Sequence, residues 1–157
     1  ALTTRDGVLI KMSGCGVFIT GDSGSGKSEL ALELIRRGHR LVADDAPEFE
    51  TRDQRLVGRA PTALRDRIQL RGLGVIDARS TFGDDAVAAE TPVDLLIHLS
   101  PDPDTATHRL GGTPPEQAIC CGHTLPFWKI PVNSSPASAT LVETVVQLHQ
   151  SGAQPWS

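Results

Sequence analysis

A run of residues near the N-terminus has the types and spacing that bind the phosphates of a nucleotide. The run matches the pattern G-x-x-x-x-G-K-[ST] and consists of Gly21, Asp22, Ser23, Gly24, Ser25, Gly26, Lys27 and Ser28. Its glycines permit backbone angles that turn N–H groups toward phosphate oxygens, and a helix that begins here would add its positive end. In such loops the lysine reaches the β- and γ-phosphates and the hydroxyl ligates Mg²⁺. The sequence therefore predicts a site for ATP and Mg²⁺.

Two adjacent carboxylates, Asp44 and Asp45, follow the next predicted strand, residues 40–43. Ligands of an open parallel sheet gather beyond the carboxyl ends of its strands, so both side chains should face the same phosphates as the loop. One carboxylate can complete the Mg²⁺ shell, and the other can accept a proton from an attacking hydroxyl. The alternative is a solvated turn, which aspartate favours.

The elements that must position these residues can be predicted from periodicity. A buried strand at residues 17–20 precedes the loop, and an amphipathic helix at residues 27–37 follows it and stops at Gly38. The remaining expectations are a hairpin at 48–51 and 55–58 laid on the main sheet, strands at 74–77 and 93–99, a long surface loop at 100–113, a closing helix at 138–150 with Ser138 as its N-cap, and a tail at 152–157. Strands alternating with helices predict an α/β fold.

Together, these blocks resemble the catalytic domain of the bacterial HPr kinase/phosphorylase family, which phosphorylates a serine of the phosphocarrier protein HPr. The matching segments are residues 7–10, 16–29, 37–45 and 71–77, with Phe82 and Gly83 behind the last. The resemblance implies a P-loop-containing kinase domain, similar to HPr kinase and phosphoenolpyruvate carboxykinase, that forms a single domain over residues 1–157. After Gly83 the resemblance is confined to Arg109, Leu110 and Gly111 and the region of Pro131 and Val132.

The family's roles, carried over by position, are implied by the resemblance. Lys27 and Ser28 become nucleotide and Mg²⁺ residues, Asp45 becomes the base on the incoming serine, and Asp44 lies beside it. The implied metal set is Ser28, Asp44 and Gln69. Arg109 becomes a catalytic arginine, although a surface arginine in a polar loop is the alternative.

The chain departs from the family pattern at three places. Asp6 stands where the family has a histidine before Gly7, and Gln69 replaces a glutamate implicated in Mg²⁺ binding. An uncharged amide should hold the metal more weakly. Residues 133–138 replace an arginine-bearing motif needed for phosphorolysis, which puts that reverse activity in doubt while the kinase residues persist.

Composition narrows the classes of partner. The 157 residues carry a net charge of −4, with no basic stripe and few aromatic residues, which argues against nucleic acid. No apolar run is long enough to span a membrane, and the N-terminus has no signal pattern. The cysteines, Cys15, Cys120 and Cys121, suit a reducing compartment, so we expect a cytoplasmic protein. A metal site at Cys120 to His123 lacks the usual ligand spacing, and we interpret His39 as structural.

The sequence thus predicts an ATP- and Mg²⁺-dependent serine kinase that acts on HPr or an HPr-like phosphocarrier. Two alternatives stay open: a nucleotide-binding regulatory protein with reduced catalysis, and a kinase for another hydroxyl substrate. Family resemblance implies a homo-oligomer, in the family a hexamer. Because neither the family's N-terminal domain nor its further C-terminal helices are present, we expect a short natural form or an excised portion.

Overall fold

A six-stranded mixed sheet forms the centre of the molecule, in the order β11-β12-β10-β3-β2-β4. A computed structural model describes residues 3–101 and 116–152. The six strands, in chain order, are β2 (Val8–Met12), β3 (Cys15–Gly21), β4 (Arg40–Asp44), β10 (Leu95–Ser100), β11 (Glu116–Cys120) and β12 (His123–Pro131). β3 pairs in parallel with β10, and β10 with β12. β2 is antiparallel to both of its neighbours, so β4 runs in the same direction as β3.

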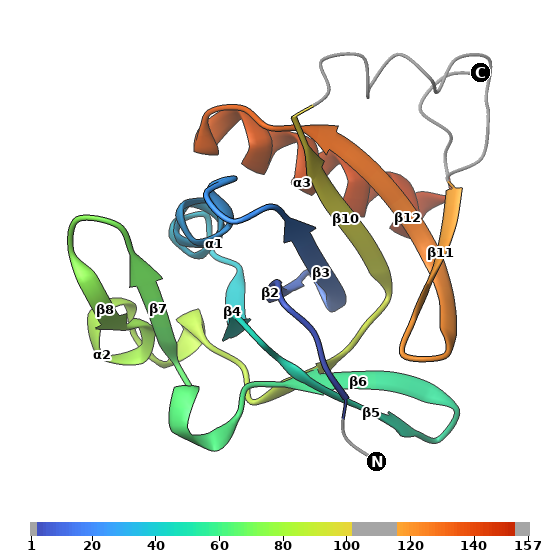
Figure 1. Ribbon diagram of the computed structural model, residues 1–157, viewed down its shortest axis with the longest axis horizontal. Helices are drawn as coiled ribbons and strands as arrows, with labels where there is room; N and C mark the ends of the chain where they lie inside the picture. The colour runs from blue at the N-terminus through green and yellow to red at the C-terminus, as the bar shows by residue number, and fades with distance from the viewer. Residues whose placement is uncertain (1–2, 102–115, 153–157) are drawn as a thin grey trace.

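Two helices, α1 (Lys27–Arg36) and α3 (Ser135–Ser151), pack on one face of this sheet (Figure 1). The apolar stripe of α1 recurs at helical spacing and is buried at Leu30, Ala31, Leu34 and Ile35. Three valines of α3, at positions 142, 145 and 146, enter the same core. Burial of these stripes fixes α1, and with it the loop that precedes α1.

A second sheet covers part of the opposite face. Its order is β1-β5-β6-β9, with bounds β1 (Thr3–Thr4), β5 (Glu48–Arg52), β6 (Arg55–Arg59) and β9 (Glu90–Pro92). The two sheets meet in an apolar layer in which the rings of Phe18 and Phe49 pack edge to face, with centroids 5.0 Å apart. The hairpin predicted at 48–51 and 55–58 is therefore confirmed, including its position against the main sheet.

A separate two-stranded hairpin, β7 (Arg67–Leu70) and β8 (Gly74–Asp77), lies beside β4 and α1 (Figure 1). It is preceded by the 3₁₀ turn η1 (Thr62–Leu64) and followed by α2 (Ala78–Phe82) and the 3₁₀ turn η2 (Asp84–Ala86). The Asp77 carboxylate caps α2 by accepting a hydrogen bond of 2.9 Å from Ser80 N. The predicted strand at 74–77 exists, but it belongs to this hairpin.

The α/β fold class is confirmed. The closing helix differs from the prediction in its start and in its cap: it begins at Ser135, and its N-cap is Ser134, whose hydroxyl accepts a hydrogen bond from Ala137 N at 3.4 Å. Ser138 is not the N-cap, because it is buried within the first turns of the helix. The sequence also left β2, β11 and β12 unassigned. Most of the predicted loop at 100–113 lies outside the described residues, and within them no helix is long and apolar enough to cross a membrane.

Candidate functional site

The phosphate loop connects the end of β3 to the start of α1. Its turns use left-handed backbone angles at Gly24 (φ 83°) and Gly26 (φ 91°), and Gly26 caps α1 without a side-chain hydrogen bond. The N–H groups of the first helical turn are therefore left for a ligand. The ammonium of Lys27 turns back over the loop and donates to Gly21 O at 2.7 Å and Asp22 O at 3.1 Å. A phosphate group would compete with these two carbonyls for the lysine.

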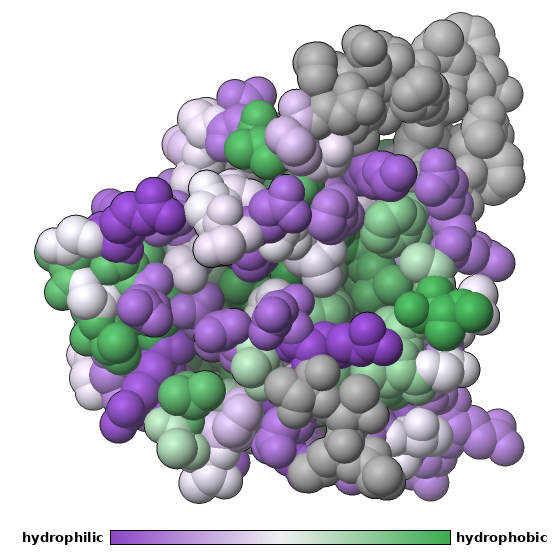
Figure 2. Space-filling view, in the orientation of Figure 1, coloured by the Kyte–Doolittle hydropathy of each residue, from purple (hydrophilic) through white to green (hydrophobic). Residues whose placement is uncertain are grey.

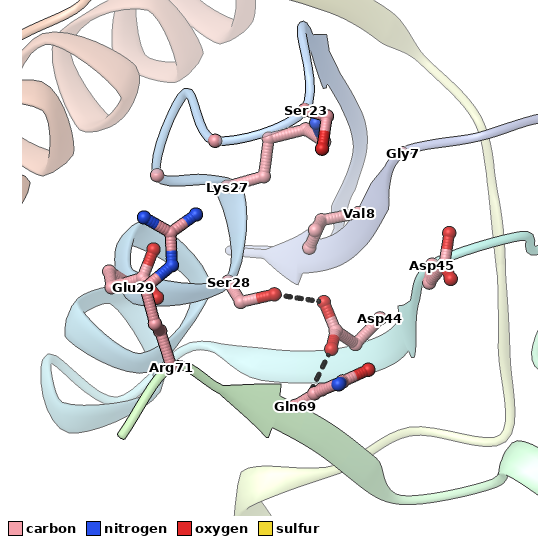
Figure 3. A pocket seen from close by; sticks show the side chains of 12 residues that line it. Gly7, Val8, Ser23, Lys27, Ser28, Glu29, Asp44, Asp45, Gln69 and Arg71 are labelled. Atoms are coloured by element: carbon pink, nitrogen blue, oxygen red, sulfur yellow. Dashed lines mark hydrogen bonds between the residues drawn. The ribbon is translucent and has the colours of Figure 1, made fainter. Parts of the chain in front are cut away.

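Asp44, at the end of β4, points into the site and is held on both carboxylate oxygens (Figure 3). Ser28 Oγ donates to Oδ1 at 2.9 Å, and the backbone N–H of Gln69 donates to Oδ2 at 2.8 Å. Burial raises the pKa of the Asp44 carboxyl, and these two hydrogen bonds act in the opposite direction. The nearby charges of Asp45 and Glu29 raise this pKa further. A bound cation would favour the charged form of Asp44.

Asp45 follows at once but has a different environment. Its side chain is exposed and, in Figure 3, points away from Ser28. Its backbone has a φ of 70°, in the left-handed region that non-glycine residues seldom occupy. Such conformations cost on the order of 1–3 kcal/mol and concentrate at functional sites. The bend separates two adjacent carboxylates, so that one is buried against Ser28 and the other faces the solvent side of the cavity.

These residues surround a single cavity of about 380 Å³. Of the residues singled out in the sequence, the lining includes Ser23, Gly24, Gly26, Lys27, Ser28, Asp44, Asp45 and Gln69. Gly7, Val8, Glu29 and Arg71 also line the cavity, although the sequence does not indicate them as site residues. Gly7 is required for packing, because a Cβ there would lie 2.5 Å from the Phe18 ring. The glycine after Asp6 therefore lets β2 begin close against β3.

Arg71 adds a cation that the sequence did not assign to the site. Its Nη2 lies 3.5 Å from the position that a Cβ on Gly24 would occupy, so the guanidinium stands next to the phosphate loop (Figure 3). No ion pair neutralises it within residues 3–101 and 116–152. The sequence signal was present in the Arg-Gly-Leu-Gly block of residues 71–74, but Arg65, Arg67 and Arg71 are interleaved with Asp66 and Gln69, and their spacing does not distinguish the arginine that faces the site.

The residues fit a nucleotide with a magnesium ion. Ser28 and Asp44 supply a hydroxyl and a carboxylate that already meet, and Mg²⁺ in such sites needs only one or two protein ligands besides phosphates and water. The buried hydroxyl of Ser25, within the loop, has no hydrogen-bond partner, which suits a loop that receives an anion. Among the described residues no three His, Cys, Asp or Glu side chains gather as a protein-only metal cage.

The other residues considered in the sequence lie elsewhere. Arg109 is outside the described residues, so its predicted role stays a prediction. Asp6 is exposed next to Gly7. His39 contacts Glu143 of α3 at 2.7 Å and does not line the cavity. Cys120 and Cys121 are free thiols at a hairpin turn, and burial raises the pKa of Cys120 to about 12.

Comparison with known proteins gives consistent matches. The family model described as HPr Serine kinase C-terminal domain matches residues 1–155. The chain is 45% identical over 140 residues to the HPr kinase/phosphorylase of Limosilactobacillus reuteri (strain DSM 20016), and the aligned region covers 88% of this chain and 43% of that protein. It is 50% identical over 115 residues to the HPr kinase/phosphorylase of Latilactobacillus sakei subsp. sakei (strain 23K), and this aligned region covers 72% of this chain and 37% of that protein. The chain thus spans less than half the length of these relatives.

A solved structure matches over most of its length. The structure of the Hpr(Ser) kinase/phosphatase from Coxiella burnetii superimposes with a TM-score of 0.86 at 33% identity. The match covers 94% of this chain and 90% of that chain.

Proposed function

The chain belongs to the HPr serine kinase C-terminal domain family, and on this premise we propose that it transfers the γ-phosphoryl group of ATP to a serine of HPr or an HPr-like phosphocarrier protein. The observation that carries the proposal is the hydrogen bond of 2.9 Å from Ser28 Oγ to Asp44 Oδ1, beside the phosphate loop and directly before Asp45 in the chain. Ser28 and Asp44 form a candidate metal-binding pair, and Asp45 adds a second carboxylate to the same cavity.

Each residue has a defined part in the transfer. The loop N–H groups bind phosphate oxygens, and Lys27 leaves the Gly21 and Asp22 carbonyls to bridge the β- and γ-phosphates. Ser28 and Asp44 would hold Mg²⁺, which neutralises charge that develops on the phosphates. Asp45 accepts the proton of the serine hydroxyl as its oxygen bonds to the γ-phosphorus and ADP departs.

Gln69 and Arg71 support this arrangement. The Gln69 backbone orients Asp44, and Gln69 lines the cavity, where its neutral side-chain amide is a weaker candidate for the metal shell than a carboxylate. The Arg71 guanidinium is close enough to the loop to stabilise negative charge on the transferred group. We further infer a cytoplasmic protein that self-associates, which rests on family resemblance and, for the compartment, on the free thiols.

The decisive experiment combines the protein, ATP, Mg²⁺ and a purified HPr-like carrier, with the phosphate located by mass spectrometry. We expect phosphoserine on the carrier, and we expect Lys27→Ala to lower the rate by at least about 10²–10³-fold, as for loss of a group that stabilises transition-state charge. Lys129→Ala, at an exposed lysine of β12, is the matched control and should leave the rate unchanged.

Other outcomes favour the alternatives. Nucleotide binding with no transfer to any hydroxyl would indicate a regulatory protein. Phosphate on a compound other than the carrier would indicate another substrate. Undiminished transfer by Lys27→Ala would contradict the assigned role of the loop.

A further inference from the structure

Two adjacent thiols lie together at the turn of the β11–β12 hairpin. Cys120 ends β11 and pairs with His123, so Cys121 and Gly122 form the turn between them. Neighbouring side chains of a strand point to opposite faces. Cys121, however, has a φ of 51°, in the left-handed region, and its Sγ lies 3.8 Å from Sγ of Cys120. The turn therefore holds two sulfur atoms in contact that a continuing strand would separate.

The two thiols differ in their access to solvent. Cys120 is 6% exposed and packs in the apolar layer between the two sheets, whereas Cys121 is partly exposed. Burial, and to a lesser extent the neighbouring Cys121, raise the pKa of Cys120 to about 12, so Cys120 is a neutral thiol near pH 7. A reagent in solution would thus react first with Cys121, and Cys120 is placed to react second.

A pocket beside the pair is large enough for a small molecule. Its volume is about 330 Å³, which is within the usual range of about 300–1,000 Å³ for small-molecule pockets. Phe18 and Phe127 line it together with Cys120, and Arg5 and Asp6 add one charge of each sign. Figure 2 shows hydrophobic residues gathered over the β11–β12 hairpin, at the right of the view. A small reagent can therefore approach the turn without displacing a strand.

A bond between these two sulfur atoms would be strained. Disulfides usually join residues whose Cα atoms are about 4.4–6.8 Å apart, whereas adjacent Cα atoms are about 3.8 Å apart across a trans peptide. Strained or exposed disulfides are more easily reduced than structural ones, and they are the labile and regulatory kind. A bond at this turn would therefore form in an oxidising environment and be reversed by cellular thiols.

We propose that Cys120 and Cys121 are a reversible modification site, at which a low-molecular-weight disulfide oxidises the pair to a vicinal disulfide. The thiolate of Cys121 attacks one sulfur of the reagent, whose S–S bond breaks and releases one small thiol. Cys120 then gives its proton to solvent and attacks Sγ of Cys121, which releases the second small thiol. The pair loses two electrons and two protons, and the reagent is reduced to two thiols. This proposal does not depend on the proposed function.

The test treats the full chain with oxidised glutathione, blocks the remaining thiols by alkylation and maps the peptides by mass spectrometry. In the wild type, the peptide that carries both cysteines should lose two hydrogen atoms, and a small dithiol should restore both thiols. Cys120→Ala leaves Cys121 no partner, so its mixed disulfide with glutathione should be at least about tenfold more abundant than in the wild type, where the adjacent thiol reacts intramolecularly. Cys15→Ala, which also removes a buried thiol, should behave as the wild type.

Three results would overturn the proposal. The wild type may keep both thiols under conditions that oxidise a free cysteine in solution. It may instead accumulate the mixed disulfide at Cys121 to the level of Cys120→Ala, or form the bond between two copies of the chain, seen as a doubled mass without reductant. Peptide mapping of the wild type decides among these results even if Cys120→Ala does not fold.

Discussion

At the scale of single residues, Asp44 and Asp45 show how neighbouring carboxylates acquire different chemistry. Asp44 is 8% exposed and accepts hydrogen bonds on both oxygens, whereas Asp45 is exposed because a left-handed bend turns the chain after β4. Environments that separate two titratable groups are a common basis for dividing roles between them. The buried Asp44 is suited to holding a metal ion in a fixed position. The exposed Asp45 is suited to accepting the proton that the substrate hydroxyl brings.

This division predicts the behaviour of Asp45→Asn. The variant should lower kcat for carrier phosphorylation by about 10²–10⁴-fold, the usual contribution of a general base, with nucleotide and Mg²⁺ affinity nearly unchanged. Asparagine tolerates left-handed angles, so the fold should persist. Asp53→Asn, which removes a charge at another left-handed aspartate (φ 53°), is the control. Parallel losses in metal affinity and kcat would assign Asp45 to the metal instead.

The sequence anticipated the residues whose function depends on local spacing, and it missed those that depend on tertiary contacts. Lys27, Ser28 and the Asp pair follow from a motif and from the end of a strand. Arg71 reaches the loop only because the hairpin that carries it is fastened to β4 through Gln69 N and Asp44. Nothing in the spacing of three similar arginines distinguishes the one that faces the site.

At the scale of elements, a charged clamp joins the end of α1 to α3. Arg37, just past α1, donates to Glu33 at 3.0 Å and to Glu143 of α3 at 2.7 Å. His39 contacts the other oxygen of Glu143 at 2.7 Å. Burial opposes ionisation of Glu143, but the hydrogen bonds from His39 and Arg37, together with the charges of these two residues, outweigh burial and hold the pKa of Glu143 below the usual range. The clamp thus favours the charged carboxylate in the folded state.

Removing that carboxylate should destabilise the protein in a pH-dependent way. Because its pKa is depressed by folding, Glu143 contributes stability above its unfolded pKa, and this is lost as the pH falls through the folded value. Glu143→Gln should cost about 1 kcal/mol near pH 7, with the difference from wild type shrinking at acid pH, as measured by urea unfolding across a pH series. Glu116→Gln, on exposed β11, should show neither effect. A pH-independent difference would contradict the ionic explanation.

The β11–β12 hairpin escaped prediction for a physical reason. Pro126 and Pro131 argue against a central strand, since proline cannot donate to a ladder. In the structure β10 pairs with β12 from Phe127 to Pro131, so Pro126 faces only β11, and Pro131 closes the strand. The turn uses positive φ at Cys121 (51°) and Gly122 (84°), an uncommon pair for a hairpin signal. Cys120 to His123, considered from the sequence as a metal site, form this turn.

At the scale of the whole molecule, strand direction decides what meets at the site. β3, β4, β10 and β12 all end at one edge of the sheet, which brings the phosphate loop, the Asp pair and the segment after Pro131 to the same side. The sequence predicted the convergence of the loop and the Asp pair from the rule for parallel strands, but not that of the segment after Pro131. It did not predict that antiparallel β2 lies between β3 and β4, because a strand's direction is set by long-range pairing.

The segment after β12 leads to a prediction about the direction of the reaction. Residues 133–138, which stand where the family resemblance places an arginine-bearing motif, contain no arginine. Their polar groups serve α3 instead: Ser134 caps the helix, and Ser138 is buried within it. Phosphorolysis must gather a phosphate dianion next to a phosphoserine, and without guanidinium forks their repulsion falls to Lys27, Arg71 and a bound metal.

We therefore expect phosphoserine carrier plus inorganic phosphate to yield pyrophosphate at least about a hundredfold more slowly than the forward transfer, since each lost charge-assisted hydrogen bond removes about 1.5–3 kcal/mol. In the forward direction the phosphates of ATP arrive already linked, so less charge has to be brought together. Both rates are measured with the same protein, metal and carrier, with pyrophosphate detected by an enzyme-coupled assay. Comparable rates would show that Arg71 or another cation has assumed the role of the absent arginines.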